Sequence, residues 1–140
     1  MITAVDTNVF VALWDPDHTL SSAARALLGA AIESGGLTVA APVFAELLAF
    51  PDRDEAFLDA FFQDTGITID WTLHEAVWRA VGRAFQAYAA RRRRHGDSVP
   101  RRILADFVIG AHALQKGHPL LTLDDRFYRT AFPGLTIVRV

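Results

Sequence analysis

The sequence predicts an α/β domain with a central, mostly parallel five-stranded sheet and helices on both of its faces. Short apolar runs rich in β-forming residues alternate with longer helical patterns along the chain. Strands separated by helices usually pair in parallel, and a parallel sheet is buried under helices on each side. The chain has 140 residues, of which 51% are hydrophobic and none is cysteine. That length supports one core without disulfides, so we expect a single domain over residues 1–140.

In the first half of the chain, residues that favour turns separate the expected elements. An Asp-Pro-Asp run at 15–17 ends the first helix, and a glycine pair at 35–36 ends the second. Pro51 ends the third helix, and Asp52 with Glu55 has the spacing of a capping box for the fourth. The elements expected here are the strands Ile2–Val5, Leu37–Ala40 and Ile67–Ile69 and the helices Thr7–Trp14, Ser21–Glu33, Val43–Phe50 and Asp52–Gln63.

The second half of the chain continues the same alternation. Thr72 and Glu75 form another capping-box pattern, which predicts the start of a long helix that runs into Arg91–Arg94. A Lys-Gly-His-Pro turn at 116–119 separates the next helix from the fourth strand. The remaining expected elements are the helix Ile103–Gln115, the strand Leu120–Thr122, a helical segment Asp124–Arg129 and the strand Leu135–Val138.

Composition excludes several classes of protein. The formal net charge is −2, and the first residues lack the basic region of a signal peptide. No stretch reaches the ~18 uncharged apolar residues of a membrane span, so we expect a cytoplasmic protein without membrane association. The lack of cysteine excludes thiol nucleophiles and thiolate zinc sites. The sequence also has no glycine-rich motif that would cradle nucleotide phosphates.

Acidic residues interrupt three apolar segments, where carboxylates are uncommon. Asp6 follows the first strand, and Glu46 lies in the apolar run PVFAELLAF. Asp106 lies in a helix that is apolar nearly all round, so its side chain is expected to face inward or into a cleft. Asp124 follows the fourth strand. Because function in parallel sheets collects at the carboxyl ends of the strands, Asp6 and Asp124 mark a candidate site.

Taken alone, each buried acid has an ordinary structural explanation. Asp6 fits a helix N-cap, and Asp106 has Arg102 four residues before it as a salt-bridge partner. Several carboxylates together are harder to explain, because two of them roughly 4 Å apart repel by about 4 kcal/mol at an effective dielectric constant near 20. Such a group shares protons or binds a cation, and ligands that are all oxygen suit Mg²⁺ or Mn²⁺.

Four segments of the chain, in order and at the right spacing, resemble the PIN-domain family. They are VDTNVFVAL at the first strand, PVFAELLAF after the second, then RRILADFVIGAHAL, and LLTLDDRFY at the fourth strand. The last two segments are the most specific. The similarity covers nearly the whole chain and extends to the VapC-type toxins of prokaryotic type II toxin–antitoxin pairs. It implies a PIN-like α/β/α sandwich.

The resemblance also implies an activity, that of a metal-dependent endoribonuclease which serves as the toxin of a toxin–antitoxin pair. Carboxylate-bound Mg²⁺ or Mn²⁺ and an activated water then cleave RNA phosphodiesters. The residues that match the family's four acids are Asp6, Glu46, Asp106 and Asp124. Asn8 matches a polar position that supports the metal network, and Thr122 is expected to supply hydrogen bonds to it.

The resemblance further implies two protein partners, a second copy of the chain and a cognate antitoxin. An exposed apolar surface would be the physical sign of such contacts. The candidate residues, which the sequence does not separate from core residues, are Leu13, Trp14, Phe57, Phe61 and Phe62.

A cluster of arginines has three explanations that stay open. It can track RNA phosphates, contact a partner such as an acidic antitoxin segment, or simply solvate a helix end whose dipole favours positive charge. The residues concerned are Arg91, Arg92, Arg93, Arg94, Arg101 and Arg102.

The main alternative to an enzyme is a PIN-like domain that acts as a noncatalytic binding or scaffold module. The complete set of acids argues against it, and metal binding would discriminate between the two. A phosphotransfer receiver is disfavoured because Lys116 precedes the late strand instead of following it. A haloacid-dehalogenase-type phosphatase is disfavoured because Asn8 stands where a second Asp is needed.

Overall fold

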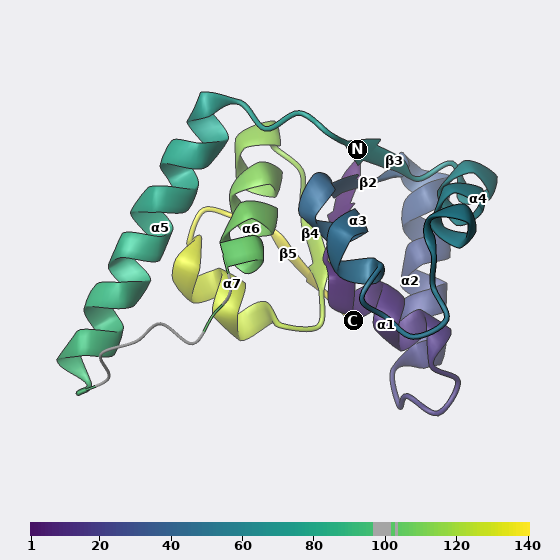
Figure 1. The fold of residues 1–140 in the computed structure, drawn as a ribbon, viewed down its shortest axis with the longest axis horizontal. Coiled ribbons are helices and arrows are strands. Elements are labelled where there is room, and N and C mark those ends of the chain that lie inside the picture. The colour runs from purple at the N-terminus through teal and green to yellow at the C-terminus, as the bar shows by residue number, and fades with distance from the viewer. Residues whose placement is uncertain (97–101, 103) are drawn as a thin grey trace.

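The computed structural model describes residues 1–96, 102 and 104–140 of the chain. Strands and helices alternate along these residues (Figure 1). The strands are β1 (Thr3–Val5), β2 (Leu37–Ala40), β3 (Thr68–Asp70), β4 (Leu120–Thr122) and β5 (Ile137–Arg139). The helices are α1 (Thr7–Trp14), α2 (Ser21–Ser34), α3 (Ala41–Leu47), α4 (Glu55–Thr65), α5 (Glu75–Arg94), α6 (Leu104–Lys116) and α7 (Asp125–Ala131).

The five strands form one parallel sheet in the order β3-β2-β1-β4-β5. The chain begins at the central strand, builds one side with β2 and β3, and then builds the other side with β4 and β5. Every residue of β1, β2 and β4 is buried, whereas the edge strands are partly exposed. Burial of this kind is expected when helices cover both faces of a parallel sheet. The predicted α/β/α sandwich is confirmed, and its sheet is entirely parallel.

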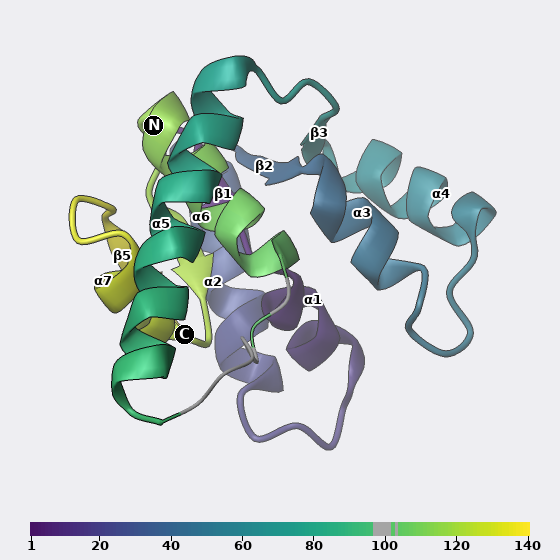
Figure 2. The ribbon, with the colours of Figure 1, turned by 60° about the vertical axis from the view of Figure 1, so that its left-hand side comes forward.

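Helices lie on both faces of this sheet (Figure 1, Figure 2). In Figure 1, α2 lies behind the sheet and α6 lies in front of it, and both helices contact β2. α5 packs along α6 and also contacts α7. Gly110 of α6 allows a close approach, because a Cβ atom there would lie 2.4 Å from the side chain of Phe132. This packing fixes the position of the helix that carries Asp106, one turn before Gly110.

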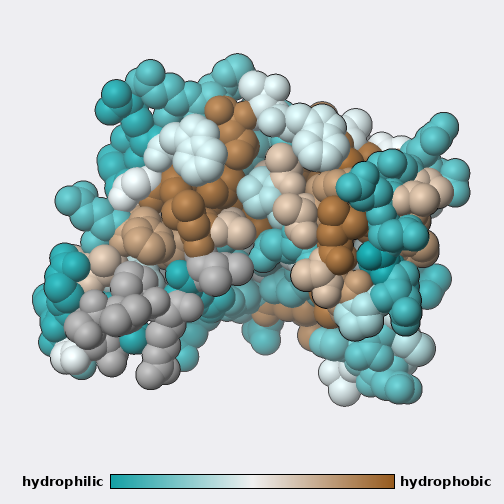
Figure 3. Space-filling view, in the orientation of Figure 1, coloured by the Kyte–Doolittle hydropathy of each residue, from teal (hydrophilic) through white to brown (hydrophobic). Residues whose placement is uncertain are grey.

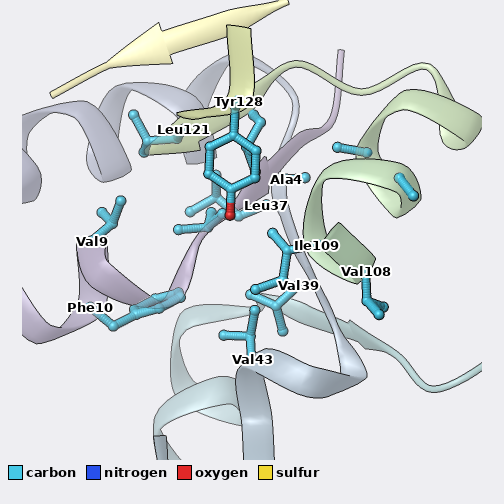
Figure 4. Packing of buried hydrophobic residues seen from close by; sticks show 14 of the residues in the cluster. Ala4, Val9, Phe10, Leu37, Val39, Val43, Val108, Ile109, Leu121 and Tyr128 are labelled. Carbon is cyan, nitrogen blue, oxygen red and sulfur yellow. The ribbon is translucent and has the colours of Figure 1, made fainter. Parts of the chain in front are cut away.

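The buried side chains form one hydrophobic cluster between the sheet and the helices. Figure 4 shows Val9 and Phe10 of α1, Val43 of α3, Ile109 of α6 and Tyr128 of α7 directed toward a common interior. All five are no more than 2% exposed. Full burial of such a side chain contributes roughly 1.5–3 kcal/mol. The core therefore fixes the elements that bring the acidic residues together.

The predicted capping box of α4 is wrong. The helix begins at Glu55, and its N-cap is Asp54, whose side chain accepts the backbone N–H of Phe57 at 2.8 Å. Asp52, the expected cap, has a φ of 63° in the preceding turn. Two acidic residues before the helix compete for the same role, and the one at the correct spacing from Phe57 takes it.

The predicted capping box of α5 is also wrong. The N-cap is His74, which makes no side-chain capping hydrogen bond. Thr72 lies before the helix, and its backbone N–H donates to Asp70 at 3.1 Å. Glu75 instead pairs with Arg79 one turn later, at 2.7 Å. The remaining elements match the expected ones within a few residues, and the expected start of the sixth helix at Ile103 lies outside the described residues.

One face of the molecule is partly apolar. Figure 3 shows hydrophobic residues gathered over α6 and α3, with hydrophilic residues at both ends of this face. The large apolar side chains that remain exposed include Trp71 at 61%, Leu104 at 50% and Trp78 at 47%. No helix in the described part of the chain is both long enough and apolar enough to cross a membrane.

Candidate active site

Three neighbouring strands bring acidic residues to one edge of the sheet. Asp6 directly follows β1, and Asp124 lies two residues beyond the end of β4, which pairs with β1. On the other side of β1, β2 continues directly into α3, which carries Glu46. Asp106 comes from α6, which contacts both β2 and α3. In parallel sheets, ligands bind beyond the carboxyl ends of the strands, where neighbouring strands connect to helices on opposite sides of the sheet. The acids lie at such a position.

Asp6 is the N-cap of α1 and is only 4% exposed. One of its carboxylate oxygens accepts the backbone N–H of Thr7 at 2.8 Å, and the other accepts the hydroxyl of Thr122 at 2.7 Å. The Thr122 oxygen in turn accepts the backbone N–H of Asp124 at 2.9 Å. The buried Thr122 hydroxyl therefore connects the segments that carry the first and the fourth acids.

Glu46 is half-buried beside the start of α1. Its Oε1 accepts the hydroxyl of Thr7 at 2.6 Å. Thr7 thus contacts two acids, Asp6 through its backbone and Glu46 through its side chain. No ion pair among the described residues includes Asp6 or Glu46, so hydroxyl and backbone dipoles are what stabilise these carboxylates.

Asp106 and Asp124 are bridged by Arg102. The Nη1 atom of Arg102 lies 3.4 Å from Asp106 Oδ2, and its Nη2 atom donates to Asp124 Oδ2 at 2.6 Å. The Arg102 guanidinium also lies over the ring of Phe127, 4.3 Å from its centroid. The salt bridge expected between Arg102 and Asp106 is therefore present, and the same guanidinium also neutralises the fourth acid.

The four acids line one cavity of about 260 Å³. The remaining residues around it are Thr7, Asn8, Val11 and Arg102. Asn8 faces this cavity, and its Oδ1 accepts the backbone N–H of Leu123 at 3.2 Å. That hydrogen bond ties α1 to the segment between β4 and Asp124.

The environment of the cavity disfavours negative charge on three of its acids. Burial raises the pKa of Asp6 to about 6, even though Thr122 stabilises the charged form, and the charge of Asp106 raises it further. Burial and the charge of Asp106 also raise the pKa of Glu46 above its usual range. The pKa of Asp106 is raised by burial despite the opposing effect of Arg102. Carboxyl groups with perturbed pKa values in one cavity are typical of functional sites.

Among the described residues, no three acidic or histidine side chains stand close enough to hold one metal ion as they are placed. Arg102 provides the positive charge between Asp106 and Asp124. The chemistry of the donors nevertheless fits a hard divalent cation, because the cavity presents carboxylates together with amide and hydroxyl oxygens. Asp6 and Glu46 are buried or half-buried and have no ion-pair partner among the described residues, so a cation bound here would stabilise their charged forms.

Two residues that interact with these acids were not singled out from the sequence. Thr7 contacts two acids, and its position as the first residue of the helix after Asp6 was the available indication. Tyr128 is 1% exposed, and burial together with the charge of Asp6 raises its pKa. Its place one helical turn after Asp124 was the only local indication, and its hydroxyl points into the interior (Figure 4).

The arginines of the predicted cluster differ in their exposure and in the cavities that they line. Arg91–Arg94 form the last turn of α5, where positive charge suits the helix dipole. Within this turn, Arg93 and Arg94 are exposed, whereas Arg91 lines a cavity beside the acidic one. Arg102 lines both cavities, and Arg101 lies outside the described residues.

A further acid at a strand end, Asp70, lies in a different environment. His112 is 1% exposed, and its Nε2 lies 2.9 Å from Asp70 Oδ2. The Lys116 ammonium lies 3.7 Å from the same oxygen. Burial raises the pKa of Asp70, but the hydrogen bonds from His112 and the Thr72 backbone outweigh it, so that the net effect lowers the pKa. This acid is compensated within the fold.

The fold and the site define a class of α/β protein in which a parallel sheet gathers acidic side chains at its carboxyl edge. Residues 3–133 match the model of the PIN domain, and the chain belongs to that family. No curated protein matches the chain in sequence.

Solved structures of VapBC and FitAcB proteins share this fold. VapBC2 from Rickettsia felis, bound to a DNA fragment from its promoter, has a TM-score of 0.68 and 19% identity, covering 99% of this chain and 98% of that chain. VapBC-1 from nontypeable Haemophilus influenzae has a TM-score of 0.65 and 20% identity, covering 99% and 98%. FitAcB from Neisseria gonorrhoeae has a TM-score of 0.63 and 20% identity, covering 99% and 97%. At these identities, the similarity shows the fold.

Proposed function

We propose that this PIN-domain chain is a metal-dependent endoribonuclease that acts as the toxin of a toxin–antitoxin pair. One observation carries the proposal. Three acids with raised pKa values share a cavity with a fourth, and neither Asp6 nor Glu46 has an ion pair among the described residues. Burying several carboxylates together destabilises the fold at neutral pH. Such a cluster is expected at a functional site, where a bound cation offsets the destabilisation.

The residues that would hold Mg²⁺ or Mn²⁺ are Asp6, Glu46, Asp106 and Asp124. When bound, the metal supplies a water of lowered pKa and neutralises charge that develops on the phosphate. Thr122 and Thr7 orient the carboxylates of Asp6 and Glu46 through their hydroxyl hydrogen bonds. Arg102 competes with the metal for Asp106 and Asp124, because it already bridges these two carboxylates.

Replacement of Asp106 tests this function most directly. The Asp106→Asn variant keeps the size of the side chain but removes its charge, and we expect it to abolish Mg²⁺- or Mn²⁺-dependent cleavage of RNA. Asp70→Asn is the matched control, since it removes one partly buried carboxylate at a strand end outside the cavity. Full activity of the Asp106 variant, with folding confirmed by circular dichroism, would contradict the assignment.

Metal binding separates the enzyme from the noncatalytic module. A ligand that binds only the folded state adds about 2.7 kcal/mol to stability at a hundredfold excess over its dissociation constant. We therefore expect Mn²⁺ to raise the melting temperature of the wild type and of Asp70→Asn, but not that of Asp106→Asn. If no variant responds and no RNA is cut, a PIN-like binding or scaffold module becomes the better explanation.

We also propose a cognate antitoxin and a homodimer as partners. The structures that share the fold are of toxin–antitoxin complexes, and this chain exposes apolar surface of the kind such contacts need. Among the candidate contact residues, Phe57 is 37% exposed and Phe62 belongs to the core. The other three are half-buried against the core, and they are Leu13, Trp14 and Phe61. Light scattering after size-exclusion chromatography measures whether the purified chain is a dimer.

A further inference from the structure

A second cavity, of about 280 Å³, lies beside the acidic cavity and shares part of its wall. Arg102 and Asp124 line both cavities. The other residues of the second cavity come from the end of α5 and from α7, and they are Tyr88, Arg91, Arg126, Phe127 and Thr130. The two cavities therefore adjoin at the ion pair that neutralises the fourth acid.

The charge of the second cavity is opposite to that of the first. Its lining includes three arginines and a single acid. That acid, Asp124, is neutralised by Arg102 at 2.6 Å. No ion pair among the described residues includes Arg91 or Arg126. Arg91 lies in α5 and Arg126 lies in α7, and both line the cavity, so positive charge is available there for an anion.

The wall between the cavities combines a guanidinium group with an aromatic ring, and further contacts hold both in place. The Arg102 guanidinium lies over the Phe127 ring, and the backbone N–H of Arg102 donates to the Tyr88 hydroxyl at 3.0 Å. Phe127 packs edge-on against Phe107, with ring centroids 5.2 Å apart. Aromatic rings and guanidinium planes are the surfaces on which unpaired nucleobases stack.

We propose that the second cavity binds the nucleotide next to the scissile phosphate of single-stranded RNA. The base stacks on the wall formed by Arg102 and Phe127, and the adjoining phosphate pairs with Arg91 and Arg126. This inference rests on the proposed nuclease function, because it takes the acidic cavity as the place of the scissile phosphate. The volume lies just below the range of roughly 300–1,000 Å³ that is usual for small-ligand pockets, which suits one nucleotide.

Stacking of a base in the second cavity requires that the base be unpaired, which favours single-stranded RNA over a duplex. A base inside a duplex is already paired and stacked on its neighbours, so it cannot enter the cavity without being extruded. Sequence-specific and stacking recognition of RNA is concentrated on single-stranded loops and ends for this reason. We therefore expect the protein to bind an unpaired strand more tightly than the same strand in a duplex.

A paired set of charge-removing variants tests the site. Arg91→Ala/Arg126→Ala removes the two cavity arginines, and Arg93→Ala/Arg94→Ala removes two exposed arginines from the same run. Both pairs are placed in an Asp6→Asn background, so that RNA stays intact in the presence of Mg²⁺. Fluorescence anisotropy then measures the dissociation constant of a labelled, mixed-sequence, single-stranded oligoribonucleotide, and of the same strand annealed to its complement, at several salt concentrations.

We expect the cavity pair to weaken single-strand binding about tenfold and to reduce the salt dependence by about 0.7 in logarithmic slope for each lost phosphate contact. The control pair should change the dissociation constant by less than about twofold. Equal losses in both pairs would overturn the site in favour of a diffuse basic surface. Duplex binding as tight as single-strand binding would overturn it as well.

Cleavage by the otherwise wild-type chain separates this inference from the proposed function. If the wild type cuts RNA with Mg²⁺ while the cavity pair binds and cuts like the control pair, the nucleotide site is wrong and the nuclease stands. If the wild type cuts no RNA but binding still depends on Arg91 and Arg126, the nuclease is wrong and the site remains as an RNA-binding site.

Discussion

Two aspartates at the carboxyl ends of strands in the same sheet have opposite environments. Asp6 directly follows β1 and is held by a backbone N–H and the Thr122 hydroxyl, and burial raises its pKa to about 6. Asp70 ends β3 and is held by His112 and Lys116, and these contacts outweigh the effect of burial and lower its pKa. The difference lies in the partners that the fold supplies, because Asp70 has a histidine and an ammonium group beside it and Asp6 has no basic side chain within ion-pair distance among the described residues.

This comparison shows which property marks a candidate site. The end of a parallel strand brings a side chain to the edge of the sheet where ligands bind. Asp6 and Asp70 both lie at such an end, so the position alone does not distinguish a functional acid from a structural one. Asp70 is neutralised by residues of its own chain, so it needs no ligand. Asp6 and Glu46 have no such partner among the described residues, and their carboxylates are more stable when something from outside brings positive charge.

The largest expected difference between the two aspartates is in activity. We expect Asp6→Asn to lower the rate of metal-dependent RNA cleavage by roughly a hundredfold or more, since it removes a charged group from the centre of the site. Asp70→Asn should change the rate by less than about threefold, because it leaves the cavity intact. Single-turnover cleavage at saturating Mg²⁺ measures both. Similar losses in the two variants would remove the distinction between the sites.

The second difference is in the stability of the metal-free protein, where Asp6→Asn should be stabilising. The folded pKa of Asp6 is about 6, against 3.8 in the unfolded chain. Between these values the folded protein keeps a proton that the unfolded chain has lost, so stability falls as the pH rises through this window and stays lower above it. Removal of the charge should therefore stabilise the fold by about 3 kcal/mol near pH 8.

Urea denaturation in the presence of a chelator, at several pH values, measures this effect. The gain from Asp6→Asn should shrink toward zero as the pH falls below 3.8, where Asp6 becomes protonated in the unfolded chain as well as in the folded protein. A variant that is less stable than the wild type near pH 8 would show that the hydrogen bonds to Asp6 outweigh the cost of its burial.

Asp70→Asn should change stability in the opposite direction. The pKa of Asp70 is lowered from 3.8 in the folded protein, so its charge stabilises the fold above that value. This contribution is lost as the pH falls through the lowered pKa. A hydrogen bond to a charged group contributes roughly 1.5–3 kcal/mol, and we expect a loss near the lower figure at neutral pH. The same denaturation series checks the sign, and equal stability of variant and wild type at neutral pH would contradict it.

The sequence predicted the acidic site better than it predicted how the site is compensated. The strand ends indicated Asp6 and Asp124, whereas Glu46 and Asp106 were indicated by their place in apolar segments and by the family resemblance. The strand order that brings these segments together was not predicted and comes from the structure. The pairing of Arg102 with Asp106 was visible from their spacing of four residues. Its pairing with Asp124, 22 residues away, depends on how the tertiary fold brings Arg102, which precedes α6, close to the segment that follows β4.

Contacts between distant elements explain the other differences. Asp70 and His112 are 42 residues apart, and nothing in either local pattern pairs them. The two wrong capping boxes arose for a related reason, since the S/T/D-x-x-E spacing is local but the helix start is set by where the chain leaves the preceding turn or strand. The single domain over residues 1–140 stays a prediction. The role of each acid stays a prediction as well.

The smallest expected effect identifies which partner compensates Asp70. Lys116 is 38% exposed at its side chain and lies 3.7 Å from the carboxylate, whereas His112 is buried and lies 2.9 Å away. Ion pairs exposed to this degree contribute little, so Lys116→Met should lower the free energy of unfolding by no more than about 0.5 kcal/mol. His112→Gln should cost more, because it disturbs a buried hydrogen bond to a charged group. If Lys116→Met lowered the free energy of unfolding more than His112→Gln, the lowered pKa of Asp70 would have to be assigned to the Lys116 ammonium group. The contrast with Asp6 would then depend on a partly exposed charge instead of a contact with a buried side chain.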